Sequence, residues 1–352
     1  MPKNTKKYNH HKIVYLMMVF LLFPFVFLVS CRREEPINPI EDQNIDYVAE
    51  ATEKKAEATT MAEETTTYSE PLTTTEIPKS TEPVKEKTEL NENHDEETDI
   101  IQEEEISFNN EWEYGENSKI HSGKAKLYRH KDGFGNGITV CINAGHGTKG
   151  GDSVMTLCHP DGSPKVTGGS TKEGAIKAMA VSPGMTFPDG TPEPKATLSL
   201  ARLVKKELLD TGYNVLMTRE TKDVQLDNIA RTLIANHYAD CHIALHYDDS
   251  ITDKGAFFIS VPDEENYREM EPVASHWKQH QMLGKILISG IHDEGFPLYN
   301  GGEKEVDLTQ TSYSTIPSID LEVGDGGSDI SEGTQKKIAI GICNGLNSFF
   351  GQ

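Results

Sequence analysis

The spacing of apolar residues changes near residue 138, and the change marks the predicted start of a folded domain. Beyond it, short apolar runs alternate with stretches in which apolar residues recur every three or four positions. The runs are typical of buried strands, and the wider spacing is typical of helices with one buried face. Strands are predicted at 138–143, 213–217, 241–246, 255–261 and 316–323. Helices are predicted at 195–211, 226–238, 271–292 and 331–349.

Strands and helices that alternate in this way predict an α/β fold over residues 137–352, with a single twisted, largely parallel sheet flanked by helices. Such sheets bind ligands beyond the carboxyl ends of their strands. Residues 148–192 interrupt the alternation and are rich in Gly, Pro, Asp, Ser and Thr. A simple connection is shorter than this. We therefore expect the segment to be functional, as a lid or a specificity element, or to be ordered by packing.

The segment before this domain, residues 31–120, is predicted to be a disordered acidic tether rich in Thr and Glu. Residues 31–110 hold 23 Asp and Glu against 7 Lys and Arg, in a chain of net charge −22. So few apolar residues cannot offset the entropy of ordering the chain. A binding tail for a partner is the alternative. The acidity also argues against nucleic acid as a partner, because phosphate binding needs a basic surface.

The first 30 residues have the pattern of an export signal. Lysines at positions 3, 6, 7 and 12 precede an uncharged apolar run over 13–30. Residues 28–31, Leu-Val-Ser-Cys, resemble the bacterial lipobox, in which the cysteine receives acyl chains that bind the membrane. This resemblance predicts a lipoprotein signal peptide at 1–30 and a lipid anchor at Cys31. The protein would then lie on the extracytoplasmic face of a bacterial cell membrane, in the cell envelope. An uncleaved signal anchor is the alternative.

Four side chains are expected to converge at the carboxyl edge of the predicted sheet. His146 follows the first strand, Glu193 opens the first helix, and His246 ends the third strand. Two histidines and one carboxylate are a suitable ligand set for a catalytic zinc ion, with one position left for water. Hydrolysis then needs a further carboxylate as general base. Glu322, near the end of the 316–323 strand, is the candidate.

Other residues compete for these roles. Glu173 lies in the long segment 148–192 that precedes Glu193, and His242 points to the same strand face as His246. We favour Glu193 because of the helix that follows it, and we interpret His242 as a core histidine. Arg219 and Arg231 are predicted to brace loops. Cysteines other than Cys31 are predicted to be buried small apolar residues, although the sequence leaves one disulfide open; they are Cys141, Cys158, Cys241 and Cys343.

The region from residue 138 onward resembles the zinc-dependent N-acetylmuramoyl-L-alanine amidases of the amidase family 3 type. Residues 144–147, Ala-Gly-His-Gly, are similar to the first zinc motif of that family. Glu193 and the helix and strand that follow it resemble the second, and residues 243–246, Ile-Ala-Leu-His, resemble the third. Residues 316–324 resemble the segment that carries the catalytic glutamate. Each motif alone is weak, but four in the right order are specific.

The resemblance implies that His146, Glu193 and His246 bind Zn²⁺ and that Glu322 transfers the proton. It also implies a substrate, the amide bond between N-acetylmuramic acid and L-alanine in peptidoglycan. Two departures from the family pattern bear on the surroundings of the metal. Asn143 stands where the family usually has Asp-Pro, and Asp320 stands where an apolar residue is usual. Both are expected to tune the zinc site through contacts with its ligands.

Two further functions remain open from the sequence. One is a non-catalytic surface lipoprotein that binds peptidoglycan on the same fold. The other is a zinc peptidase that acts on a different amide. The complete set of His146, Glu193, His246 and Glu322 favours the active amidase.

Overall fold

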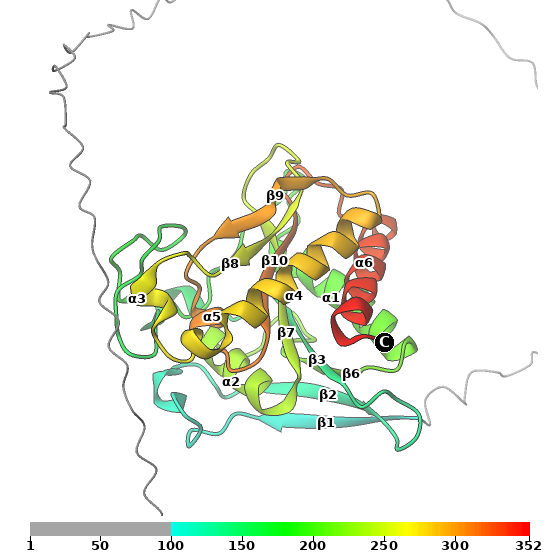
Figure 1. The fold of residues 1–352 in the computed structure, drawn as a ribbon, viewed down its shortest axis with the longest axis horizontal. Coiled ribbons are helices and arrows are strands. Elements are labelled where there is room, and N and C mark those ends of the chain that lie inside the picture. Colours follow the sequence, from blue (N-terminus) through cyan, green and yellow to red (C-terminus); the bar gives the residue numbers. More distant parts are fainter. Residues whose placement is uncertain (1–99) are drawn as a thin grey trace, which may run out of the picture. The chain divides into compact units, whose positions relative to one another are not determined.

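The strands predicted from the sequence lie side by side in one sheet. The computed structural model of the chain describes residues 100–352 (Figure 1). Within that range the main sheet has eight strands in the order β1-β2-β6-β3-β7-β10-β8-β9. The strands are β1 (Ile101–Ser107), β2 (Lys124–His130), β3 (Thr139–Ala144), β6 (Asn214–Met217), β7 (Cys241–Asp248), β8 (Ala256–Ser260), β9 (Leu298–Glu305) and β10 (Ser318–Asp325).

The centre of this sheet is parallel, as predicted. Strands β6, β3, β7 and β10 pair in parallel, whereas β2 runs antiparallel to β6 and β8 runs antiparallel to β10. The carboxyl ends of β3, β7 and β10 therefore meet at one edge. The predicted fold class, a largely parallel sheet flanked by helices, is confirmed.

Helices cover both faces of the sheet, which explains why its central strands are apolar on both sides. Alternate residues of β7, such as Ile243 and Leu245, pack in a core with α1, α4 and α6. On the opposite face, Cys141 of β3 packs with residues of α2. Figure 1 shows α4 and α6 together on the near side of the sheet. The helices are α1 (Glu193–Asp210), α2 (Asn228–Tyr238), α3 (Glu265–Arg268), α4 (Val273–Asp293), α5 (Thr309–Tyr313) and α6 (Glu332–Phe350).

The last part of the predicted tether belongs to the folded unit instead. Strand β1 and the 3-10 turn Gly115–Asn117 fall within residues 31–120, yet β1 pairs along its whole length with β2. Buried Asp227 accepts hydrogen bonds from the Ser118 hydroxyl and from the backbone N–H groups of Lys119 and Ile120. The tether boundary at residue 120 was therefore wrong. The sequence missed β1 because its triple Glu suggested disorder, whereas those acids form ion pairs across the hairpin, such as Lys124–Glu105 at 2.6 Å.

The long segment 148–192 is ordered, as one of the two alternatives predicted. It contains the 3-10 turn Gly151–Ser153 and a small hairpin of β4 (Met155–Leu157) and β5 (Lys177–Met179). Its middle is attached to fully buried Asp307. That carboxylate lies 3.0 Å from Nε2 of His159 and 2.7 Å from Nζ of Lys165, and it accepts hydrogen bonds from the backbone N–H of Val166 and the hydroxyl of Thr167.

Several predictions concern residues 1–99, which lie outside the described residues; they include the signal peptide, Cys31 and most of the tether. Among residues 100–352, no helix is long and apolar enough to cross a membrane.

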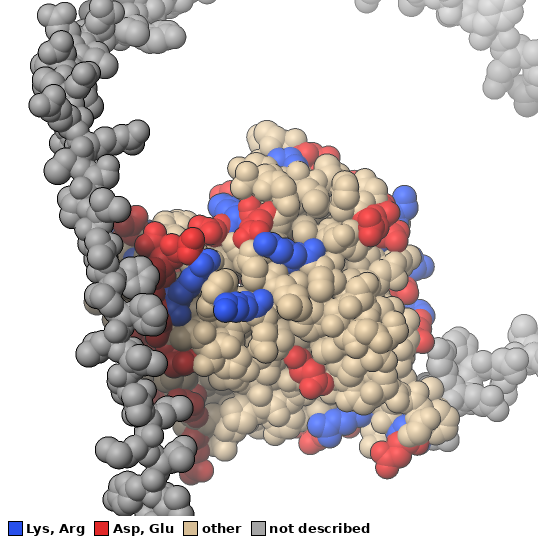
Figure 2. Space-filling view, viewed as in Figure 1, with Lys and Arg blue, Asp and Glu red and all other residues tan. Residues whose placement is uncertain are grey.

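The four cysteines in residues 100–352 are free and buried, which confirms their interpretation as small apolar residues. On the face shown in Figure 2, Lys and Arg are interspersed with Asp and Glu.

Candidate metal centre

His146 is held in a tight turn directly after β3. Its φ of 64° lies in the left-handed region, which is uncommon for a residue with a side chain and must be held by its surroundings. The guanidinium of buried Arg231 donates to the carbonyl of His146 at 2.7 Å, and that of Arg219 donates to the carbonyl of Gly145 at 2.9 Å. Both arginines therefore brace the turn, as predicted.

The ring of His146 is oriented by the segment 148–192. Its Nδ1 lies 2.9 Å from the carbonyl oxygen of Ser182. A carbonyl oxygen can only accept, so Nδ1 donates to it, and Nε2 is the nitrogen whose lone pair the neutral ring would offer to a metal. The sequence did not identify Ser182, because the contact joins two segments that are 36 residues apart.

Glu193 is the first residue of α1, and its side chain is only 4% exposed. Oε2 accepts a hydrogen bond from the backbone N–H of Met185 at 2.9 Å, and Oε1 accepts one from the backbone N–H of Tyr247 at 3.1 Å. These contacts fix the carboxylate beside the end of β7. The competing residue Glu173 is exposed in the segment 148–192 and lies outside the group formed by His146, Glu193 and His246.

His246 lies near the end of β7 and packs against Gly145. A Cβ atom added to Gly145 would lie 2.3 Å from the His246 ring, so only glycine permits this approach. The other candidate on this strand, His242, is fully buried, and neither of its ring nitrogens has a hydrogen-bond partner. Among the described residues, it lies outside the group of three side chains that could hold a metal ion, and its burial agrees with its interpretation as a core histidine.

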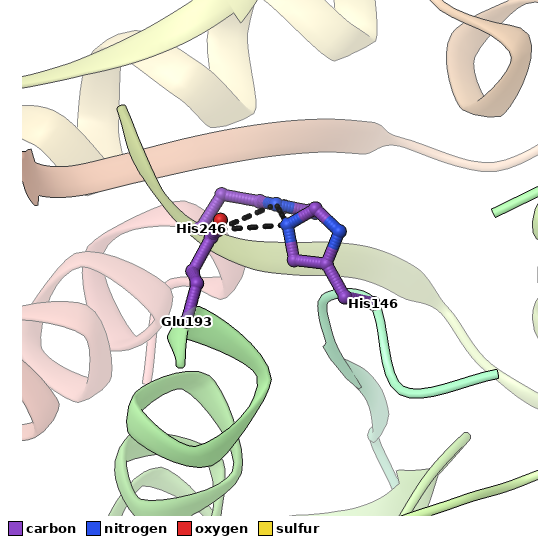
Figure 3. A group of neighbouring side chains, drawn as sticks. All are labelled: His146, Glu193 and His246. Carbon is purple, nitrogen blue, oxygen red and sulfur yellow. Dashed lines mark hydrogen bonds and ion pairs between the residues drawn. The ribbon is translucent and has the colours of Figure 1, made fainter. Parts of the chain in front are cut away.

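The three candidate ligands converge on one point (Figure 3). Nε2 of His146 lies 2.8 Å from Oε1 of Glu193, and Nδ1 of His246 lies 3.0 Å and 3.2 Å from those two atoms. Two imidazole nitrogens and one carboxylate oxygen suit zinc. Bonds of about 2.0–2.1 Å at tetrahedral angles place ligand atoms roughly 3.3 Å apart. The observed separations are close to that value, so the residues fit a zinc ion.

Two more carboxylates, Asp320 and Glu322, lie on the neighbouring strand β10. In the parallel register Glu322 is paired with His246, and Asp320 lies two residues before it on the same face. Oδ2 of Asp320 is 3.8 Å from Nε2 of His246. Oδ1 of Asp320 and Oε2 of Glu322 are buried and have no hydrogen-bond partner. These unpaired acceptors lie on the strand face that also carries His246, and they are available to a cation, a water molecule or a substrate.

The electrostatics of the group favour a cation. Burial opposes ionisation of Glu193, but hydrogen bonds from His146 and His246 outweigh it and hold the pKa of Glu193 below its usual value. Burial alone would lower the pKa of His246, but the carboxylates of Asp320 and Glu193 raise this pKa to about 10. Burial, and then the charge of Asp320, raise the pKa of Glu322 well above the usual value for a glutamate. A carboxyl group with a raised pKa is suited to proton transfer near neutral pH.

Fold and site together define a class: an α/β domain whose sheet edge carries a His/Glu/His group that could hold a metal ion, with a further carboxyl group on the neighbouring strand. The sequence profile of one family, described as N-acetylmuramoyl-L-alanine amidase, matches residues 140–348, which is more than half of the chain. The chain therefore belongs to amidase family 3, and its enzyme class is that of the N-acetylmuramoyl-L-alanine amidases. No curated protein sequence matches it.

Solved structures share this fold at low sequence identity. The N-acetylmuramyl-L-alanine amidase Ami1 from Mycobacterium smegmatis is 18% identical and covers 62% of this chain and 98% of its own, with a TM-score of 0.51. An N-acetylmuramoyl-L-alanine amidase from Clostridium difficile 630 is 17% identical with the same coverage and a TM-score of 0.44. The Mycobacterium smegmatis structure supports the fold assignment.

Proposed function

We propose that this chain is a zinc-dependent hydrolase that cleaves the amide bond between N-acetylmuramic acid and L-alanine in peptidoglycan. One Zn²⁺ per catalytic domain would be bound by Nε2 of His146, Oε1 of Glu193 and Nδ1 of His246. The observation that carries the proposal is the convergence of these three atoms beside the unpaired carboxylate of Glu322. Membership of the amidase family supports the choice of substrate.

Different residues would bind the metal, transfer the proton and position the site during hydrolysis. Zinc, when bound, would supply a Lewis acid that polarises the amide carbonyl and activates water. Glu322 would accept the proton of the attacking water and deliver it to the leaving nitrogen of L-alanine. Its raised pKa suits both halves of this transfer, because the group must take and release a proton near neutral pH. Ser182, Met185 and the two arginines keep the ligands and their turn in place.

The proposed location follows from the chain before the catalytic domain. A lipid anchor at Cys31 would hold the enzyme on the extracytoplasmic face of the cell membrane, and the acidic tether would let the domain reach the peptidoglycan. Two acyl chains or one chain with a second signal are needed for stable anchoring. Labelling of the cells with a radioactive fatty acid would test this, because Cys31→Ser is expected to remove the label.

The activity is tested with the full chain and purified peptidoglycan, with and without added zinc. The expected result is zinc-dependent appearance of new L-alanine amino termini, which is lost in Glu322→Gln. Glu173→Gln is the matched control, because Glu173 is exposed in the segment 148–192 and should leave the rate unchanged. New reducing sugar ends, or amino termini from within the stem peptide, would contradict the proposal. Binding without any cleavage would support the non-catalytic alternative.

A further inference from the structure

The two candidate histidine ligands differ in what holds the ring nitrogen that faces away from the metal position. For His146 this nitrogen is Nδ1, which donates to the carbonyl of Ser182. For His246 it is Nε2, since Nδ1 is the atom that lies among the other ligand atoms. Metal-binding histidines almost always donate this second N–H to a carboxylate, a carbonyl or a water, which fixes the tautomer and the ring orientation. His246 therefore needs an acceptor on its Nε2 side.

Asp320 is the carboxylate on that side. Oδ2 of Asp320 lies 3.8 Å from Nε2 of His246, and its side chain is only 16% exposed. Its second oxygen, Oδ1, is buried without a hydrogen-bond partner. Among residues 100–352, His246 is the only ion-pair partner of the Asp320 side chain. A buried charge is costly unless it is paired.

We propose that Asp320 is a positioning residue for zinc, which accepts the Nε2–H of His246 and thereby presents Nδ1 of that ring to the metal. The inference rests on the proposed zinc site. The contact of 3.8 Å is longer than the roughly 2.9 Å of a hydrogen bond and would be completed directly or through one water when zinc binds. Asp320 touches neither substrate nor metal in this arrangement; it acts through His246.

The negative charge of Asp320 gives this contact a second effect. A carboxylate that accepts from an imidazole makes the opposite ring nitrogen a stronger donor to a metal. Ser182 offers His146 a neutral carbonyl, which does this less. The two histidines are therefore oriented by different acceptors, a neutral carbonyl for His146 and a carboxylate for His246. The contribution of His246 to zinc affinity should depend on Asp320 more than on any other neighbour.

The test is the zinc dissociation constant of the full chain, measured by competition with a chelator. Asp320→Leu removes the acceptor and places an apolar residue at this strand position, and loss of such a partner typically weakens metal binding by about 10- to 100-fold. Asp320→Asn keeps an acceptor oxygen without the charge, so an intermediate affinity is expected. Asp248→Asn is the matched control: it removes the same charge near the end of β7, but Asp248 pairs with Lys254 and not with His246.

A spectroscopic measurement separates positioning from a general structural effect. In the zinc-loaded wild type, ¹⁵N NMR of the histidine side chains should place the His246 proton on Nε2 in a slowly exchanging signal. Asp320→Leu should lose the slow exchange while the metal-free variant keeps the wild-type circular dichroism spectrum. Unchanged zinc affinity and an unchanged Nε2–H signal in Asp320→Leu would overturn the inference alone. Failure of the wild type to bind zinc would overturn the proposed function as well.

Discussion

Glu322 and His246 are direct neighbours across β10 and β7, and their side chains lie on the same face of the sheet. The pairing places a carboxyl group with a raised pKa beside a candidate metal ligand without any contribution from a flexible loop. Sites built on strands are held more precisely than sites on loops. The strand that carries the acid and the strand that carries the ligand therefore form the rigid part of the site, to which the turn of His146 and the first residue of α1 are added.

Substitution of His246 and substitution of Glu322 are expected to have different effects on the zinc content of the protein. His246→Ala removes one of three ligands and should abolish stoichiometric zinc, measured by elemental analysis after gel filtration. Glu322→Gln should retain one zinc per chain, yet lose about 10²- to 10⁴-fold in hydrolysis rate, as is usual when a general acid–base group is removed. Loss of zinc from Glu322→Gln would make that residue a ligand and contradict its assigned role.

Gly145→Ala is expected to damage the site without touching a ligand. The new Cβ would meet the His246 ring at 2.3 Å, so either the turn or the ring must move. We expect loss of zinc binding together with destabilisation of about 1–3 kcal/mol, the usual cost of overpacking. Gly168→Ala is the control, since a Cβ there meets nothing within 4 Å. Equal zinc affinity in both variants would show that the close packing of Gly145 against His246 is not needed for zinc binding.

Asp307→Asn should loosen the segment 148–192. The substitution leaves the buried ammonium of Lys165 without its carboxylate, and breaking a buried ion pair in this way costs about 3–5 kcal/mol. Urea unfolding measures the loss, and limited proteolysis should show new cleavage within the segment. Asp210→Asn removes an exposed partner of Lys206 and should cost no more than about 0.5 kcal/mol. Similar losses in the two variants would mean that Asp307 does not anchor the segment.

His242 and His280 should make the protein sensitive to acid. Burial, with the nearby charge of Arg231 for His242 and of His276 for His280, lowers the pKa of each to about 3, against 6.5 in the unfolded chain. Between these values the unfolded chain binds protons that the folded chain does not, so stability is complete above pH 6.5 and falls as the pH decreases towards 3. At pH 5 each histidine should cost about 2 kcal/mol of unfolding free energy.

The free energy of unfolding, measured by urea titration between pH 7 and 5, checks this expectation. His242→Leu should reduce the slope of stability against pH by close to one proton. Ile243→Val, on the same strand, should cost about 0.5–1.5 kcal/mol equally at every pH, because it removes a methyl group and no titrating group. An unchanged slope in His242→Leu would show that this histidine is protonated in the fold.

The sequence identified the parts of the fold whose signal is local. All five predicted strands and four predicted helices are present, because alternation of apolar runs directly reflects which face each element buries. Three strands of the main sheet, β1, β2 and β9, escaped notice. Strands β1 and β9 are edge strands with exposed, charged residues such as Glu103 and Lys304, which leave no apolar pattern. The boundary at residue 120 failed for the same reason.

The candidate site was predictable only in part. Each of the four candidate residues lies at or near an end of a recognisable element, so their convergence could be expected from the rule for the carboxyl edge of a parallel sheet. They are His146, Glu193, His246 and Glu322. Ser182 and Met185 hold two of these side chains from a segment without periodicity, and no local pattern distinguishes them from their neighbours. Asp320 was visible as an unusual acid, but its position beside Nε2 of His246 depends on the register of β10 with β7.

The central claim is that one zinc ion is bound by three specified atoms. X-ray diffraction from zinc-loaded crystals, recorded on both sides of the zinc absorption edge, tests it most directly. We predict one anomalous peak per chain, about 2.0–2.2 Å from Nε2 of His146, Nδ1 of His246 and Oε1 of Glu193. A peak bound elsewhere, or none at these three side chains at saturating zinc, would contradict the account.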